Sequence, residues 1–151
     1  LPADAVRPAL AACAGEVLSR LGPGHAHALC HHDVHEQNLV TDSAGRLWLV
    51  DWEYAGLGDP VFDLASSASQ LELSAAGVGL LCDEYVRAGG TAQPVRLELA
   101  RWAFDYVQWL WYRGLLATAA GPDAVEAAHR AGRIERGLQT RASGVLRCNN
   151  H

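Results

Sequence analysis

The chain contains no lysine and no methionine among its 151 residues, so all 12 of its basic residues are arginines. The absence of lysine excludes any mechanism in which a lysine of this chain holds a phosphate group. Methionine is missing even at position 1, which leads us to expect a piece of a longer protein or a processed chain.

Basic clusters, long apolar runs and cysteine pairs are also missing. The net charge of −5 argues against a nucleic-acid partner, which would require a basic face. No apolar run approaches the ~20 residues of a membrane span, so we expect no membrane partner. The four cysteines have no C-x-x-C spacing, which is typical of reduced thiols in a cytoplasmic protein: Cys13, Cys30, Cys82 and Cys148.

What is present indicates a globular α+β fold that is mainly helical. Half of the residues are hydrophobic, which supports a folded core. Apolar spacing predicts a helix over 5–21, which ends at a Gly-Pro-Gly stop. Turn-forming residues at 41–45 separate two β-prone runs at 38–40 and 46–50, which predicts a β-hairpin. The chain after Pro60 predicts helices over 61–72, 75–88, 94–119 and 122–146.

The predicted hairpin would bring three polar side chains together. If its strands pair through the turn, Asn38 at the start of one strand lies beside Asp51 at the end of the other, with Asp33 within reach. Two oxygen ligands from the protein, completed by phosphate oxygens and water, suit Mg²⁺. A third carboxylate beside them could accept the proton of an attacking hydroxyl. This set of groups predicts phosphoryl transfer.

The spacing of these groups supports that interpretation. His31, Asp33 and Asn38 match the pattern H-x-D-x-x-x-x-N, which is the catalytic-loop pattern of protein kinases. The pattern stands directly before a hairpin that ends at Asp51, and this placement strengthens the prediction.

The stretches CHHDVHEQNLV and LWLVDWEYAGLGDPVFDLA resemble the C-terminal lobe of the aminoglycoside phosphotransferase and choline kinase superfamily. The resemblance covers roughly residues 29–66. It implies a protein-kinase-like C-lobe with a catalytic β-hairpin. It also implies a kinase that uses ATP and Mg²⁺ to phosphorylate a small cationic alcohol, in the manner of choline, ethanolamine or thiamine kinases. Aminoglycosides are less favoured acceptors.

The resemblance also implies roles for individual residues. Asp33 would be the catalytic base, and His31 would support the catalytic loop. Asn38 and Asp51 would bind the Mg²⁺ of the nucleotide. Asp63 would be structural, accepting hydrogen bonds from backbone amides of the loop. The side chains expected near the acceptor in this segment are His35, Glu53 and Tyr54.

The nucleotide-binding N-lobe of such kinases, with its glycine-rich loop and lysine, is not found in residues 1–151. We therefore expect the whole chain to be a C-lobe whose partner is a missing N-terminal lobe. Such a fragment should be inactive by itself, and an uncovered apolar face could make it self-associate.

The segment RWAFDYVQWLWYRGLL at 101–116 is unusually aromatic. Trp102, Tyr106, Trp109 and Arg113 share one face of a helix. Most of these rings are expected in the core, but Tyr106 and Trp109 are also candidates to bind a cationic acceptor through cation–π contacts.

Two other interpretations remain open at the level of sequence. A catalytically inactive, pseudokinase-like lobe could bind an alcohol or a partner protein without chemistry. Alternatively, His31 and His35 have the i, i+4 spacing of a metal site, and His32 with Asp33 resembles the His-Asp pair of metal-dependent phosphohydrolases. That class would leave Asn38, Asp51 and Asp63 unexplained.

Overall fold

The computed structural model describes residues 3–23 and 28–147. The chain divides into two compact units. We call residues 23–101 the hairpin unit, and residues 1–22 together with 102–151 the helical unit. His25, His27 and Cys148 lie outside the described residues.

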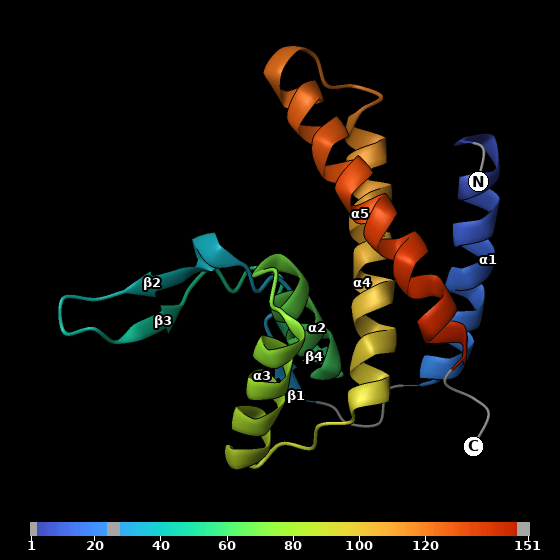
Figure 1. The fold of residues 1–151 in the computed structure, drawn as a ribbon. Coiled ribbons are helices and arrows are strands. Elements are labelled where there is room, and N and C mark those ends of the chain that lie inside the picture. The colour runs from blue at the N-terminus through green and yellow to red at the C-terminus, as the bar shows by residue number, and fades with distance from the viewer. Residues whose placement is uncertain (1–2, 24–27, 148–151) are drawn as a thin grey trace. The chain divides into compact units, whose positions relative to one another are not determined.

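The hairpin unit contains two small antiparallel sheets. In the first, β1 (Ala28–Cys30) pairs with β4 (Gly56–Gly58), with Leu29 opposite Leu57. In the second, β2 (Leu39–Thr41) pairs with β3 (Leu47–Leu49), with Val40 opposite Trp48. The β2–β3 hairpin extends away from the helices of its own unit (Figure 1). A short 3₁₀ helix, η1 (Glu36–Asn38), leads into β2.

Asp42 organises the turn of the β2–β3 hairpin. Its carboxylate accepts hydrogen bonds from the backbone amides of Ala44 and Arg46 at 2.9 and 3.0 Å. It also accepts from the Arg46 side chain at 2.8 Å and from the Trp48 indole at 3.0 Å. Gly45 takes a positive φ of 77°, which glycine adopts without steric strain. The turn chemistry therefore accounts for the predicted hairpin.

Helices α2 (Val61–Gln70) and α3 (Ala75–Arg87) follow the strands, and α4 (Pro94–Leu115) belongs to this unit as far as Arg101. The Asp59 carboxylate accepts the Val61 amide at 3.1 Å at the start of α2, and the Ser74 hydroxyl accepts the Gly77 amide at 3.2 Å at the start of α3. The Ser74 contact is a typical N-cap, whereas Asp59 lies one residue before Pro60, the N-cap of α2. The buried apolar residues of the unit are Cys30, Val61, Ala65, Ala68, Leu97, Leu99 and Ala100.

The helical unit is built from α1 (Ala3–Leu21), the rest of α4 and α5 (Gly121–Arg147). Helix α1 packs against α5, and the Arg20 guanidinium donates to the Val145 carbonyl. Trp102 is fully buried, and its indole donates to the Leu138 carbonyl at 3.1 Å. The indole nitrogen would otherwise be an unsatisfied donor in an apolar core.

The predicted fold class, α+β and mainly helical, is confirmed, as is the β-hairpin. Strand β4 was not predicted, because it is a Gly-Leu-Gly segment that becomes a strand only by pairing with the distant β1. The helix predicted over 94–119 ends earlier, at Leu115, where the Leu115 carbonyl accepts the amides of Thr118 and Ala119 in a terminal turn. Across the described helices, none combines the length and the apolar character needed to cross a bilayer.

Candidate functional site

The loop between β1 and η1 is held by the carboxylate of Asp63, in the first turn of α2. Its two oxygens accept the backbone amides of His31 at 2.7 Å and His32 at 2.9 Å. His32 has a positive φ of 65°, an unfavourable conformation for a residue with a Cβ. Charge-assisted hydrogen bonds to two successive amides stabilise this bend. A Cβ at Gly58 would lie 2.6 Å from the His32 ring, so glycine at this position leaves room for the ring where it lies.

His31 joins this loop to the end of the hairpin. The side chain is buried, with 1% exposed, and its Nε2 lies 2.9 Å from the Val50 carbonyl. Its Nδ1 accepts the backbone amide of Asp33 at 3.2 Å, which places the ring proton on Nε2. The edge of the ring contacts Trp52, with centroids 4.8 Å apart. Both ring nitrogens are engaged, so His31 positions Asp33 and is not arranged as a metal ligand.

Asp33 and Asn38 contact one another directly. The amide nitrogen of Asn38 donates to the Asp33 backbone carbonyl at 2.9 Å and to the Asp33 carboxylate at 3.3 Å. Asn38 is buried, and its backbone carbonyl accepts the Val50 amide at 2.9 Å. Because the nitrogen end of the Asn38 side chain faces Asp33, its carbonyl oxygen is left for another partner.

Asp51 follows β3 and Val50, next to this pair. Its φ of 63° takes it out of the strand conformation into the left-handed region. A non-glycine residue held there stores conformational strain of ~1–3 kcal/mol, and such residues cluster at functional sites.

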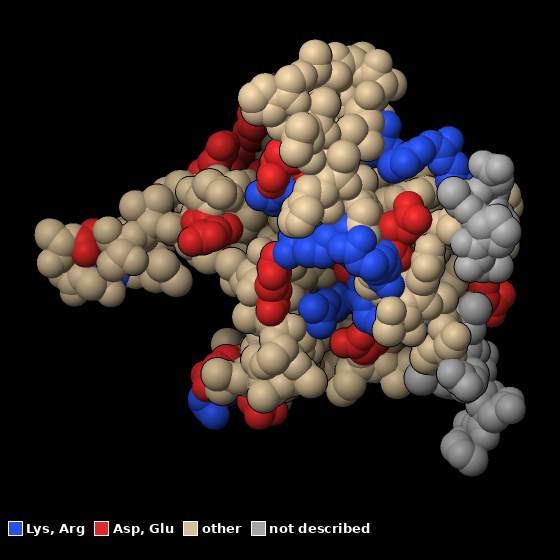
Figure 2. Space-filling model, turned by 45° about the horizontal axis from the view of Figure 1, so that its top comes forward, with Lys and Arg blue, Asp and Glu red and all other residues tan. Residues whose placement is uncertain are grey.

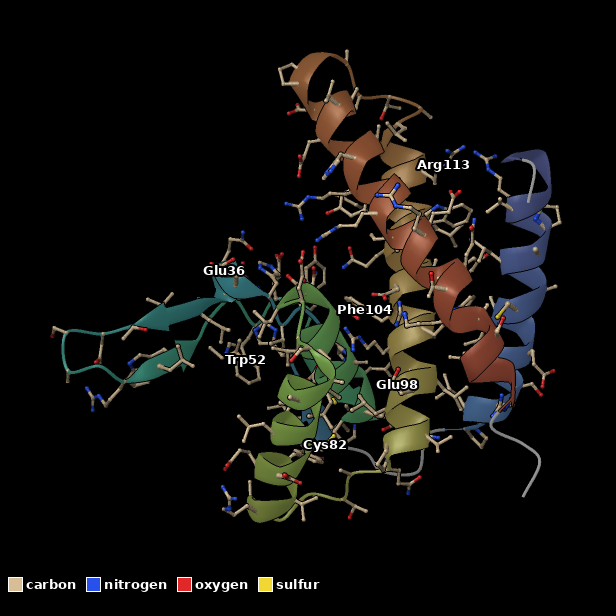
Figure 3. All side chains as sticks on the ribbon, viewed as in Figure 1. Glu36, Trp52, Cys82, Glu98, Phe104 and Arg113 are labelled. Atoms are coloured by element: carbon tan, nitrogen blue, oxygen red, sulfur yellow. The ribbon has the colours of Figure 1, made fainter. Side chains whose placement is uncertain are left out.

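Acidic groups surround the hydroxyl of Tyr54. The pKa of Tyr54 is raised above 10.0 chiefly by the charge of Glu53 and by a hydrogen bond with it, and also by the charges of Asp33 and Asp51. Acidic side chains gather where the hairpin joins the rest of its unit (Figure 2). Trp52 and Glu36 lie in the same region (Figure 3). The site is therefore strongly negative, which favours a cation as its ligand.

His35, like Asn38, contacts the carboxylate of Asp33. Its Nε2 lies 3.2 Å from the Asp33 carboxylate, and its Nδ1 lies 2.8 Å from the side-chain oxygen of Gln37. The contact between His35 and Asp33 was not foreseen from the sequence. The spacing of two residues alone does not indicate it, because it depends on the bend of the loop at His32.

The donor atoms of this site fit Mg²⁺. The carbonyl oxygen of Asn38 and the carboxylate of Asp51 lie at the ends of two paired strands, and both are hard oxygen ligands. Mg²⁺ is typically held by one or two protein groups together with water and phosphate oxygens. Within residues 3–23 and 28–147, no three His, Cys, Asp or Glu side chains gather around a common metal position. The phosphohydrolase alternative, which needs such a histidine-rich cluster, has no support in the described part of the chain.

The two candidate aromatic residues belong to the helical unit. Tyr106 stacks between Trp102 and Trp109, with ring centroids 5.6 and 5.8 Å away. Trp109 is buried, with 2% exposed, and its indole donates to Glu135 at 3.0 Å. Their role in binding a cationic acceptor stays a prediction.

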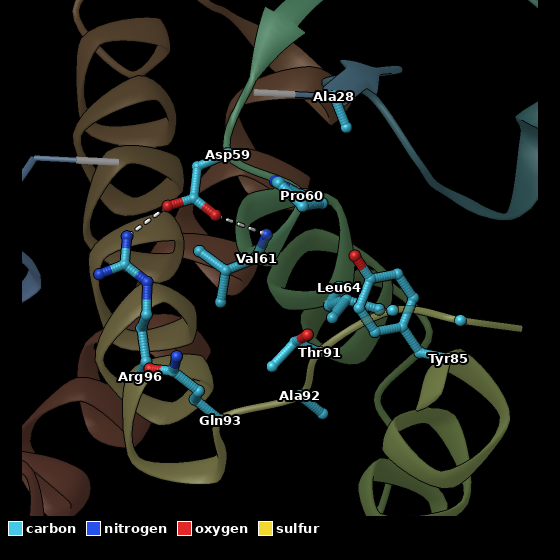
Figure 4. A pocket seen from close by; sticks show the side chains of 12 residues that line it. Ala28, Asp59, Pro60, Val61, Leu64, Tyr85, Thr91, Ala92, Gln93 and Arg96 are labelled. Carbon is cyan, nitrogen blue, oxygen red and sulfur yellow. Dashed lines mark hydrogen bonds and ion pairs between the residues drawn. The ribbon is translucent and has the colours of Figure 1, made fainter. Parts of the chain in front are cut away.

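A cavity of about 430 Å³ in the hairpin unit, away from Asp33 and Asn38, was not foreseen from the sequence. It lies beside Asp59, which forms an ion pair with Arg96 and accepts the Val61 amide (Figure 4). Tyr85 and Leu64 contribute to its wall. A Cβ at Gly90 would lie 2.3 Å from the Tyr85 ring, so this glycine allows the ring to take its place.

The chain is similar to several known proteins over part of their length. It is 29% identical to the protein LicA of Haemophilus influenzae over 89 residues, which cover 54% of this chain and 33% of LicA. It is 58% identical to the thiamine kinase of Salmonella paratyphi B over 36 residues, which cover 24% of this chain and 13% of that kinase. The crystal structure of the choline kinase LicA from Streptococcus pneumoniae superposes with a TM-score of 0.67 at 25% identity, covering 92% of this chain and 48% of that one.

The chain thus spans less than two thirds of the length of these relatives. A sequence model described as the phosphotransferase enzyme family matches residues 1–104, which is more than half of the chain. This match includes the loop, the hairpin and Asp63. The chain belongs to the phosphotransferase enzyme family.

Proposed function

We propose that this chain is the C-terminal lobe of a kinase that transfers the γ-phosphate of ATP, with Mg²⁺, to the hydroxyl of a small cationic alcohol. The observation that carries the proposal is the contact of Asn38 with Asp33 next to the paired end of the hairpin. It brings a potential base and two oxygen ligands to one edge of the hairpin unit. Membership of the phosphotransferase family supports the reaction class.

In this proposal Asp33 is the catalytic base. Its carboxylate accepts the proton of the acceptor hydroxyl as the hydroxyl oxygen forms a bond to the γ-phosphorus and ADP leaves. His31 positions Asp33 through its hydrogen bond to the Asp33 amide. Asp63 keeps the loop in the required bend by binding the two amides before Asp33.

Asn38 and Asp51 would hold the magnesium ion of the nucleotide. When bound, that ion would neutralise charge on the phosphate oxygens. The strained backbone of Asp51 supports the assignment, because the hairpin alone gives no reason for a left-handed aspartate there.

The acidic surroundings of Tyr54 support a cationic acceptor. Glu53 and Tyr54, with His35 beside Asp33, are the side chains proposed to contact it. The similarities to LicA and to thiamine kinase favour choline, ethanolamine or thiamine over an aminoglycoside. We expect the 151-residue chain by itself to be inactive, because donor binding in such kinases also requires an N-terminal lobe.

The test is ADP production by the complete protein with Mg²⁺ and ATP against choline, ethanolamine, thiamine and kanamycin. Turnover with one of the first three supports the proposal and identifies the acceptor, and turnover with kanamycin alone contradicts the proposed acceptor class. If Mg·ATP does not bind at all, the kinase proposal fails and a binding module without chemistry becomes the better description.

The role of Asp33 is tested by Asp33→Asn in the same protein. Removing the base should lower kcat by about 10²–10⁴-fold while ATP affinity changes little. Asp83→Asn is the matched control, because Asp83 is an exposed carboxylate on α3. An unchanged kcat in Asp33→Asn would show that another group accepts the proton.

A further inference from the structure

A groove in the helical unit lies between α1 and α4. It has a volume of about 450 Å³, within the range of small-molecule sites. Tyr106 lines the groove with a half-buried ring, Trp109 lines it while almost fully buried, and Pro8 and Leu110 contribute aliphatic surface. At Gly114 a Cβ would meet no heavy atom within 4 Å, so space remains open at this end of the groove.

Two arginines line the groove, one from each helix. Arg7 comes from α1 and Arg113 from α4, and both side chains are exposed. Arg113 extends between the two helices (Figure 3). Neither arginine forms an ion pair with a carboxylate in the described part of the chain. Both arginines that line the groove therefore have guanidinium groups that are not neutralised by a described carboxylate.

The two acidic side chains near the groove already have partners within the helical unit. Asp105 forms an ion pair with Arg141, and Glu135 accepts the Trp109 indole at 3.0 Å. No carboxylate is among the residues that line the groove. The groove thus carries local positive charge on a chain whose net charge is −5. A cation would be repelled here, whereas a carboxylate or phosphate could bind a guanidinium in a bidentate manner.

We propose that this groove binds a small organic anion with a flat apolar body, such as an aryl phosphate. The anionic group lies between Arg7 and Arg113, and the body rests against the accessible part of Tyr106 and the aliphatic side chains of Pro8 and Leu110. This site is separate from the proposed phosphoryl-transfer residues and does not depend on their activity. In this proposal Tyr106 contacts an anion, in contrast to the cationic acceptor predicted for it from the sequence, and the buried Trp109 supports the Tyr106 ring.

The test is a titration of the 151-residue chain with phenyl phosphate, phenol and phenyltrimethylammonium, followed by the NMR signal of the Trp109 indole. Phenyl phosphate should bind saturably and shift that signal, with weaker binding by phenol and by the cation. No saturable shift with phenyl phosphate, or tighter binding of phenyltrimethylammonium, would overturn the proposal.

Substitutions of single arginines distinguish a specific binding site from nonspecific electrostatic attraction of phenyl phosphate. Arg7→Gln and Arg113→Gln should each weaken phenyl phosphate binding about tenfold, the loss expected for one charge-assisted hydrogen bond. Arg113→Lys should recover part of the affinity, since it restores the charge without the bidentate geometry. Arg136→Gln removes an exposed charge of α5 outside the groove and should have no effect. An equal loss in Arg136→Gln would show nonspecific attraction and refute the site.

Discussion

At the scale of single residues, Asp63 and Glu53 show two different uses of a carboxylate. Asp63 is structural: both of its oxygens accept backbone amides, and the bend of the loop at His32 depends on them. Glu53 acts through its charge, which raises the pKa of a neighbouring hydroxyl. Each use leads to a measurable consequence.

Replacing Asp63 by alanine should lower the free energy of unfolding by about 2–3 kcal/mol. The substitution leaves the amides of His31 and His32 without their charged acceptor, and the strained φ of His32 loses its support. Urea denaturation measures the change. Asp83→Ala, at an exposed position of α3, should change stability by less than about 0.5 kcal/mol. A wild-type midpoint in Asp63→Ala would contradict the structural role.

Replacing Glu53 by glutamine should lower the pKa of Tyr54 towards its ordinary value of 10.0. The negative charge of Glu53 is the largest cause of the raised pKa, and the charges of Asp33 and Asp51 would remain. Ultraviolet absorbance of the tyrosinate, measured against pH in wild type and variant, reports the shift. Glu36→Gln serves as the control, since Glu36 does not contribute to the Tyr54 pKa. An equal fall in both variants would mean that no specific contact joins Glu53 to Tyr54.

At the scale of elements, the β2–β3 hairpin illustrates how one side chain can organise a turn. The four hydrogen bonds to the Asp42 carboxylate come from two backbone amides and two side chains. They lower the pKa of Asp42 from 3.8 to about 2, and the hydrogen bond from Trp48 is the largest cause. The charged form of Asp42 is thus the form that the folded hairpin favours.

The hairpin should lose this stabilisation on acidification. Because the pKa of Asp42 is lower in the folded chain than in the unfolded one, the contribution is fully present above about pH 4 and is lost as the pH falls through the folded pKa of about 2. The NMR shift of the Trp48 indole proton should titrate with a midpoint near pH 2. Asp42→Asn should abolish this titration, and a midpoint near pH 4 in the wild type would contradict the hydrogen-bond network.

At the scale of the whole molecule, each of the two compact units has a buried core of its own. Alanines and leucines dominate the core of the hairpin unit, whereas the core of the helical unit is centred on Trp102 and Leu138. Leu138 is fully buried, and its carbonyl accepts the Trp102 indole. The core of the helical unit therefore combines the buried Trp102 and Trp109 with Leu138.

Leu138→Ala should destabilise the helical unit by about 2–5 kcal/mol, because it removes buried methyl groups and leaves a cavity beside Trp102. Hydrogen exchange followed by mass spectrometry should show faster exchange in α5 and in α4 from Trp102 onward. Leu80→Ala is the matched control, since Leu80 is 61% exposed on α3. Equal protection of α5 in wild type and Leu138→Ala would mean that this leucine does not hold the core.

By itself the sequence determined the features that depend on neighbouring residues. Apolar periodicity specified the helices, the residues at 41–45 specified the hairpin turn, and the spacing of Asp33, Asn38 and Asp51 indicated a phosphotransfer chemistry. The tertiary structure alone decided the contacts between distant segments. It paired β4 with β1, and it placed Arg7 and Arg113 on the same groove. Such contacts depend on how helices and strands pack, and local propensity carries no information about them.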